Sequence, residues 1–159
     1  MENFQLTKNF SFNEVIHTNS GINNSNIVDV YLNNAKNLAI NVLQPLRDYL
    51  GTSITISSWF RCHLLNKKVG GSPTSEHKTG SAADLADNGK LREMFFYIKD
   101  NLTFNQLIYE TNKYGVHWIH VSYKSNGVNK KEVLVSKWNE KNRKYDYIPY
   151  NDSMLDIIK

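Results

Sequence analysis

Hydrophobic residues between Ile27 and Leu50 recur at intervals of three and four positions, which is the spacing of one face of an α-helix. We therefore expect a long core helix over this range. Pro45 falls inside the pattern, and because proline has no backbone N–H, we expect a kink or a restart of the helix near Leu43. Gly51 follows and suits the left-handed conformation that often ends a helix.

Elsewhere the apolar positions predict short elements. Alternation of apolar and polar residues predicts strands at 53–57, 81–85, 104–110, 117–123 and 132–136. The segments 104–110 and 117–123 are expected to pair as an antiparallel hairpin, and helical spacing predicts further helices at 13–18, 61–69 and 91–99. The pattern predicts a single α+β domain over residues 1–159, with a mainly antiparallel central sheet and helices packed on one side.

The composition is that of a globular domain, with 40% hydrophobic and 21% charged residues. No apolar run is long enough to span a membrane, and residues 1–8 lack the apolar core of a signal peptide, so we expect neither feature. A single cysteine, Cys62, excludes an internal disulfide and a cysteine-rich zinc finger. The net charge of +4 suggests an anionic partner such as nucleic acid, teichoic acid or a peptidoglycan surface.

Three side chains have the character of zinc ligands. His77 and Asp84 are seven residues apart, so they can share a metal only if the chain between them turns back. Gly80 can provide that turn, because glycine adopts positive φ angles freely. His120 lies in the predicted strand 117–123 and supplies a second imidazole. Two imidazoles and one carboxylate form a three-ligand zinc site that keeps a position for water.

The pattern Ser-x-His-x-x-Gly-x-Ala-x-Asp at residues 75–84, followed by Trp-Ile-His at 118–120, resembles the zinc D-alanyl-D-alanine carboxypeptidases and the related phage peptidoglycan endopeptidases. The resemblance covers about residues 8–123 and implies a fold like that of these peptidases and of hedgehog domains. It also implies one zinc ion per chain, held by His77, Asp84 and His120. Residues 124–159 lie beyond it, and we expect there a strand followed by a basic, aromatic extension.

The resemblance suggests roles for four more residues. Arg61 resembles the family arginine that binds a substrate carboxylate through two parallel hydrogen bonds, and Ser75 either orients a ligand, contacts substrate or caps a loop. Several relatives carry an acidic residue three positions before the last zinc histidine, where this chain has His117. Two candidates for the general base follow, namely Glu110, which ends the preceding strand, and His117 itself.

We expect a zinc peptidase of the carboxypeptidase or L-alanyl-D-glutamate endopeptidase type that cuts stem or cross-link peptides of peptidoglycan, as endolysins do. Its expected partner is the wall peptide, without specific nucleic acid binding, and it is expected to be a monomer. We expect synthesis in a bacterial cytoplasm and action at the wall after release or from a phage virion. The first alternative is a zinc-stabilised binding module of the same fold without catalysis. The second is a nucleic-acid-binding protein, for which the chain has no base-stacking motif.

Overall fold

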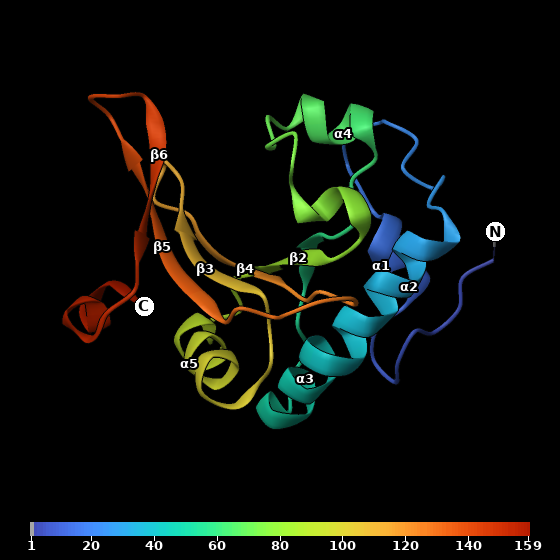
Figure 1. The fold of residues 1–159 in the computed structure, drawn as a ribbon, viewed down its shortest axis with the longest axis horizontal. Helices are drawn as coiled ribbons and strands as arrows, with labels where there is room; N and C mark the ends of the chain where they lie inside the picture. The colour runs from blue at the N-terminus through green and yellow to red at the C-terminus, as the bar shows by residue number, and fades with distance from the viewer. Residues whose placement is uncertain (1) are drawn as a thin grey trace.

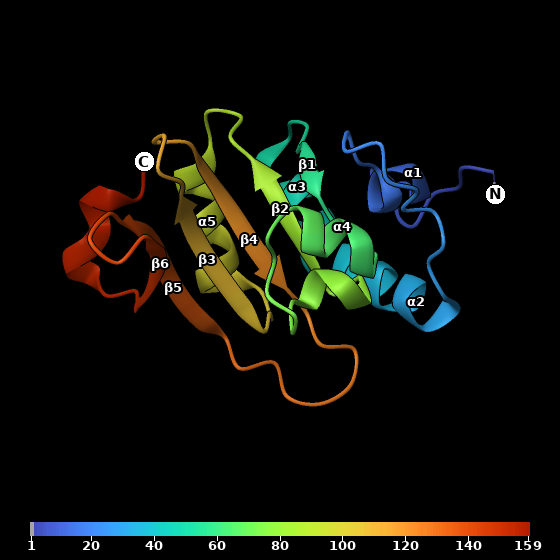
Figure 2. The ribbon, with the colours of Figure 1, turned by 90° about the horizontal axis from the view of Figure 1, so that it is seen from above.

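A computed structural model describes residues 2–159 and has a six-stranded sheet at its centre, with strand order β1-β2-β4-β3-β5-β6. The strands are β1 (Ile56–Ser58), β2 (Ala82–Ala86), β3 (Gln106–Thr111), β4 (His117–Ser122), β5 (Glu132–Asn139) and β6 (Lys144–Pro149). Neighbouring strands are antiparallel except β3 and β5, which are parallel. The predicted α+β class with a mainly antiparallel sheet is confirmed, and Figure 2 shows the strands side by side.

Helices lie on both faces of this sheet, but the long ones lie on one. The helical elements are α1 (Phe12–Ile16), α2 (Asp29–Leu38), the π-helical turn η1 (Ala39–Leu43), α3 (Gln44–Leu50), α4 (His63–Lys68), the 3-10 turn η2 (Glu76–Thr79), α5 (Leu91–Asn101) and the 3-10 turn η3 (Asp152–Ile157). The helices α3 and α5 cover one face, whereas α4 and η2 stand on the other face near β2 (Figure 1). Among residues 2–159, no helix combines the length and hydrophobicity that a membrane span requires.

The predicted core helix is present as the continuous run α2, η1 and α3. The expected irregularity before Pro45 takes the form of η1, in which the N–H of Gln44 donates to the carbonyl of Ala39, five residues earlier. A widened turn fits there because Pro45 has no N–H and its ring crowds the preceding turn. Gly51 ends the helix in the left-handed conformation, with its N–H bonded to the carbonyl of Arg47, which confirms its predicted capping role.

The predicted hairpin is also present, with Ile108 of β3 opposite His120 of β4. Strand β5 runs three residues further than predicted, and these residues pair with β6 beyond the end of the pairing with β3. The sequence did not predict β6 as a strand. It is the outermost strand and is largely exposed, so no continuous apolar face marks it in the sequence.

The hydrophobic core lies between the sheet and the helices α2, α3 and α5. Ile119 and Val121 of β4 point into it and are completely buried, and Phe95 of α5 packs edge-on against Tyr109 of β3. Since successive side chains of a strand face opposite ways, His120 is directed to the open face. The packed face of β3 and β4 thus fixes the positions of the polar side chains on the other face.

The turn between η2 and β2 explains why residue 80 is glycine. Gly80 has φ +74°, as its predicted role in turning the chain requires, and an added Cβ would lie 2.5 Å from the carbonyl oxygen of Tyr31. We expect Gly80→Ala to lower the free energy of unfolding by about 2–4 kcal/mol, because backbone strain and a clash add together. Chemical denaturation measures the change.

Gly115→Ala is the matched control for this substitution. Gly115 has a similar φ of +81°, but no atom lies within 4 Å of the added Cβ. We expect a loss of about 1–2 kcal/mol from the strained φ alone. Equal losses at Gly80 and Gly115 would contradict the importance of the contact with Tyr31.

Candidate metal centre and substrate cleft

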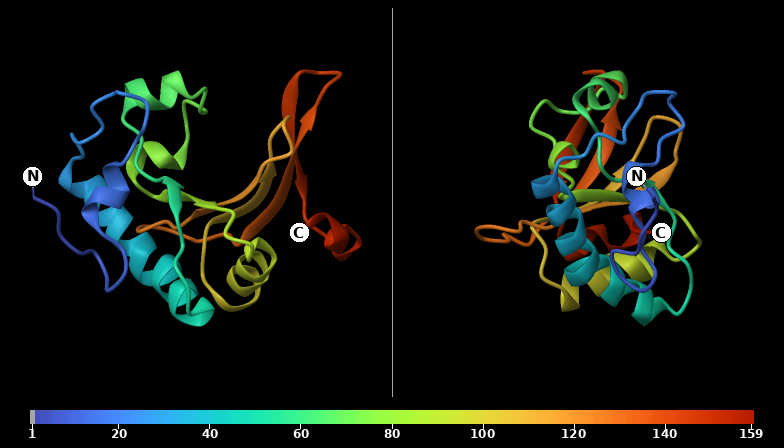
Figure 3. Two further views of the ribbon diagram at one scale, coloured as in Figure 1. Left: turned by 180° about the vertical axis from the view of Figure 1, so that it is seen from behind. Right: turned by 90° about the vertical axis from the view of Figure 1, so that its right-hand side faces the viewer.

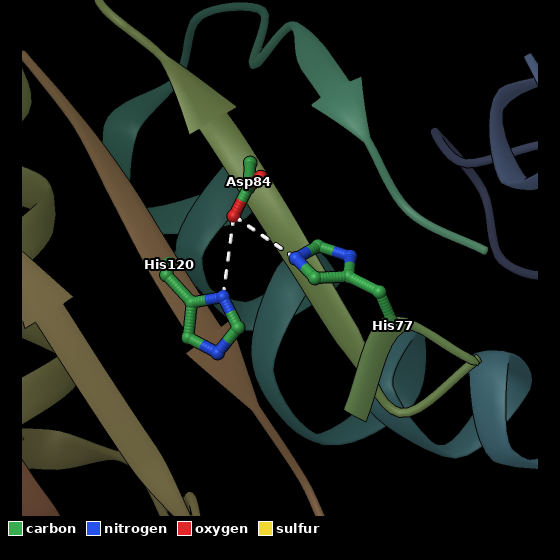
Figure 4. Close-up of side chains that lie close together, drawn as sticks. All are labelled: His77, Asp84 and His120. Carbon is green, nitrogen blue, oxygen red and sulfur yellow. Dashed lines mark hydrogen bonds and ion pairs between the residues drawn. The ribbon is translucent and has the colours of Figure 1, made fainter. Parts of the chain in front are cut away.

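Three elements bring the candidate metal ligands together. His77 comes from η2, Asp84 from β2 and His120 from β4, where His120 lies directly opposite Asp84 in the strand register. Nε2 of His77 and Nδ1 of His120 each lie 3.2 Å from Oδ1 of Asp84. Figure 4 shows both rings converging on this carboxylate. All three side chains are buried, and their ligand atoms lie within 4.8 Å of one another.

The surroundings of His77 determine which ring nitrogen faces Asp84. Nδ1 of His77 lies 2.7 Å from the carbonyl oxygen of Trp59, and because a carbonyl only accepts, Nδ1 must carry the proton. To bind a metal, the ring would use Nε2, which carries a free lone pair when the only ring proton is on Nδ1. Ser75 helps to place the ring, since its hydroxyl accepts the N–H of His77 at the start of η2. The indole of Trp59 donates to the carbonyl of Gly80 and holds this turn against β1.

The donor set fits a zinc ion. Burial by itself would raise the pKa of Asp84, but the charges and hydrogen bonds of His77 and His120 hold that pKa well below its usual range. Asp84 is therefore an ionised carboxylate beside two imidazoles, which is the mixture of nitrogen and oxygen donors found in three-ligand zinc sites. The single cysteine, Cys62, is not among the grouped side chains.

Arg61 lies next to the same carboxylate. Its Nη2 is 3.1 Å from Oδ2 of Asp84, so one carboxylate oxygen faces the histidines and the other faces the guanidinium. Nε of Arg61 donates to the hydroxyl of Ser58, and its backbone N–H donates to the carbonyl of His77. The guanidinium is thereby fixed at the edge of the metal centre, with N–H groups to spare for a further partner.

Glu110 lies on β3 opposite Trp118 of β4 and lines the cleft that holds the metal ligands. Burial raises the pKa of its carboxyl to about 7, and the negative charge of Asp84 acts in the same direction. A carboxyl with a pKa near neutrality can both accept and release a proton under physiological conditions. Of the two general-base candidates, Glu110 is the one that lines the cleft with the metal ligands.

His117 is not brought into this cleft. It is the first residue of β4. Because side chains alternate along a strand, it shares a face with Ile119 and Val121, opposite to the face of His120. Nδ1 of His117 lies 2.7 Å from Oγ1 of Thr111, and the ring stacks on Tyr109 with centroids 5.4 Å apart. It lines a separate cavity near the C-terminal segment.

The cleft has a volume of about 650 Å³ and a wall on each side. Residues 70–72, which follow α4, form one wall, and side chains of β5 and β6 form the other. Figure 3 shows α4 and the β5–β6 hairpin rising on either side of the open face of the sheet. The predicted site residues that line this cleft are the three metal ligands, Arg61, Ser75 and Glu110, and none of the predicted site residues came from β5 or β6.

Glu76 is a further cleft residue that the sequence did not single out. Its two carboxylate oxygens accept hydrogen bonds from the hydroxyl of Ser122, at 2.8 Å, and from the amide of Asn105, at 3.2 Å. These bonds tie η2 to the sheet immediately beside His77. Both partners are distant in sequence, and the only available signal was the position of Glu76 next to a predicted ligand.

The raised pKa of Glu110 makes the stability of the metal-free protein depend on pH. A carboxyl whose pKa is higher in the folded than in the unfolded chain contributes stability below the unfolded pKa and loses it as pH rises through the folded pKa. Relative to Glu110→Gln, we expect the wild-type free energy of unfolding to fall by about 2.5 kcal/mol between about pH 5 and about pH 8. Denaturation in the presence of a chelator measures this difference. Parallel pH curves for the two proteins would contradict the burial of this carboxyl.

Comparison with known proteins identifies the family. A family model described as peptidase M15 matches residues 8–122, which is well over half of the chain. The matched range includes the three candidate ligands, Arg61 and Glu110, and it ends at the last residue of β4. No curated protein matches the chain significantly. Peptidases of the M15 family depend on zinc, in agreement with the buried group of two histidines and an aspartate. The chain therefore belongs to the peptidase M15 family of zinc metallopeptidases.

Proposed function

We propose that this protein hydrolyses a peptide bond in the stem or cross-link peptides of peptidoglycan, in the manner of the phage endopeptidases that its motifs resemble. The proposal rests on the side chains that line the cleft. A buried ligand group, a fixed guanidinium and a carboxyl with a pKa of about 7 line the same cavity. These are the groups that peptide hydrolysis next to a substrate carboxylate requires.

His77, Asp84 and His120 are proposed to hold the zinc ion. When bound, zinc polarises a carbonyl oxygen and lowers the pKa of water so that hydroxide is available near neutral pH. Glu110 accepts a proton from the attacking water and transfers it to the nitrogen of the departing amine. The C–N bond then breaks to give a carboxylic acid and a neutral amine, and Glu110 returns to its ionised form. The acid passes its remaining proton to the amine or to solvent, which leaves a carboxylate.

Arg61 is proposed to orient the substrate. It already contacts Asp84 through Nη2, and its other N–H groups can bind a carboxylate in the fork geometry of a guanidinium. A terminal D-alanine or the free carboxyl of a γ-linked glutamate provides such a group in wall peptides. Ser75 acts indirectly, because its hydroxyl holds the backbone of His77.

Digestion of purified peptidoglycan by the zinc-loaded protein tests this function, with a chelated sample alongside and mass spectrometry of the released fragments. We expect fragments in the presence of metal alone, and their masses identify the bond that is cut. If several wall types yield no fragment although each chain binds one zinc ion, the zinc-stabilised binding module becomes the better interpretation.

We further propose that residues 1–159 act as one peptidase domain and as a monomer, at the wall, after release from the cytoplasm or from a virion. Strands β5 and β6 follow the range matched by the family but complete the same sheet, which supports one working unit. Size-exclusion chromatography with light scattering measures the oligomeric state. A stable dimer would contradict the monomer.

A further inference from the structure

Two tyrosines on β6 face the cleft. Tyr147 is paired with Ser136 of β5, and Ser136 is in turn paired with Glu110 of β3. The three side chains therefore lie in one row across the cleft side of the sheet, with Tyr145 two positions away from Tyr147 on the same face. Both tyrosines line the cavity that holds the metal ligands, although they follow the range matched by the family.

The rings of these tyrosines are available for contact. Tyr145 is 37% exposed and Tyr147 is 54% exposed, so both side chains keep accessible surface at the cleft. Tyr145 is braced edge-on against Trp138, with centroids 5.1 Å apart. In residues 2–159, Tyr147 packs against no other aromatic ring. Tyrosines placed this way offer a large contact area at a small cost in side-chain entropy.

On the side of the cleft formed by β3, β5 and β6, the lining side chains are uncharged apart from Glu110. Ile108 of β3 and Leu134 of β5 are paired in the register, and with Gln106 they form the floor between the metal ligands and the tyrosines. Arg61 lies at the opposite end, since it follows β1 while the tyrosines belong to β6 at the far side of the sheet. A peptide with its carboxylate at Arg61 would cross the metal ligands and reach the tyrosines with its other end.

We propose that Tyr145 and Tyr147, with Leu134, form a subsite that binds an uncharged segment of the peptide substrate on the side of the cleaved bond away from Arg61. The subsite sets a minimum length for the substrate. This proposal rests on the proposed function, because it concerns the substrate of the same cleft.

The test compares two synthetic wall peptides that share the cleaved bond and the carboxylate end but differ in length at the other end. For Tyr145→Ala/Tyr147→Ala, we expect kcat/KM for the long peptide to fall about 10–100-fold, because the lost ring contacts each contribute binding energy. We expect kcat/KM for the short peptide to stay unchanged. Tyr114→Ala is the matched control, since Tyr114 is 79% exposed in the β3–β4 turn and does not line the cleft.

Equal losses for both peptides, or no loss for either, would overturn the subsite. Zinc content and the free energy of unfolding of the tyrosine variants are expected to match wild type, because exposed side chains contribute little to stability. A fall in both quantities, accompanied by equal losses for the two peptides, would show a structural role instead. Tyr147→Phe is expected to keep the preference for the long peptide, because the ring provides the contact.

A binding experiment separates this proposal from the proposed function. The long peptide is titrated calorimetrically into zinc-loaded Glu110→Gln protein, with and without the two tyrosine substitutions. Weaker binding after the substitutions supports the subsite. If the wild-type protein nevertheless cuts no wall peptide, the proposed hydrolysis is rejected while the subsite is retained. Equal binding of the long peptide to the two proteins, or binding to neither of them, rejects the subsite.

Discussion

Glu110→Gln is expected to slow peptide-bond hydrolysis by about 10²–10⁴-fold while leaving zinc bound, since general acid–base groups typically contribute this much. Glutamine keeps the size and shape of the side chain but can neither accept nor release the transferred proton. The rate constant kcat is measured with a defined wall peptide, and bound zinc is measured by elemental analysis of the same sample. Loss of kcat with an unchanged zinc content is the result that identifies a general base.

Glu93→Gln is the control for this change, because Glu93 lies on α5 in an exposed ion pair with Lys90, outside the cleft. We expect its kcat to equal that of wild type. An undiminished rate in Glu110→Gln would place the base elsewhere, and a loss of zinc in that variant would show that Glu110 supports the metal centre instead.

His120→Ala is expected to weaken zinc binding by at least about 100-fold and to abolish hydrolysis with it. Loss of a residue that only supports a ligand already costs 10–100-fold in metal affinity, and loss of a ligand itself removes more. The unfolding temperature provides a second measurement. A chelator should lower it in wild type and have no effect in His120→Ala, because only the protein that binds zinc is stabilised by it.

His117→Ala is the matched control for this experiment. It removes a histidine from the same strand, three residues away, but on the face that does not contribute to the cleft. We expect normal zinc binding and normal hydrolysis. If His117→Ala lost hydrolysis while keeping zinc, His117 would have to act in catalysis despite its position, and the assignment of Glu110 would be wrong.

Much of the metal centre could be predicted because its information is local. The eight residues from His77 to Asp84 contain the glycine that turns the chain back, and the apolar pair Ile119 and Val121 shows which way His120 faces. The core helix was equally accessible, since its apolar stripe is long and Pro45 and Gly51 mark its irregular points.

Other features depend on contacts that no local pattern records. Strand β4 and the irregular segment 123–131 separate β3 from β5 in the sequence, and the parallel pairing of β3 with β5 places Ser136 beside Glu110. The tyrosine wall follows from that pairing. The choice between Glu110 and His117 was open for a related reason. The alternation of side chains along a strand is a weak guide at its end. Only the folded sheet shows that the side chains of Glu110 and His117 lie on opposite faces.

The pairing of β3 on both sides also affects where the chain can be shortened. A protein cut after residue 123, close to the limit of the family match, would lack β5 and leave the backbone N–H and C=O groups of β3 without partners along one side. Such an open edge is a template for pairing with another molecule. The strand that carries Glu110 would then be the most aggregation-prone part of the shortened protein, so β5 and β6 protect its solubility as well as closing the cleft.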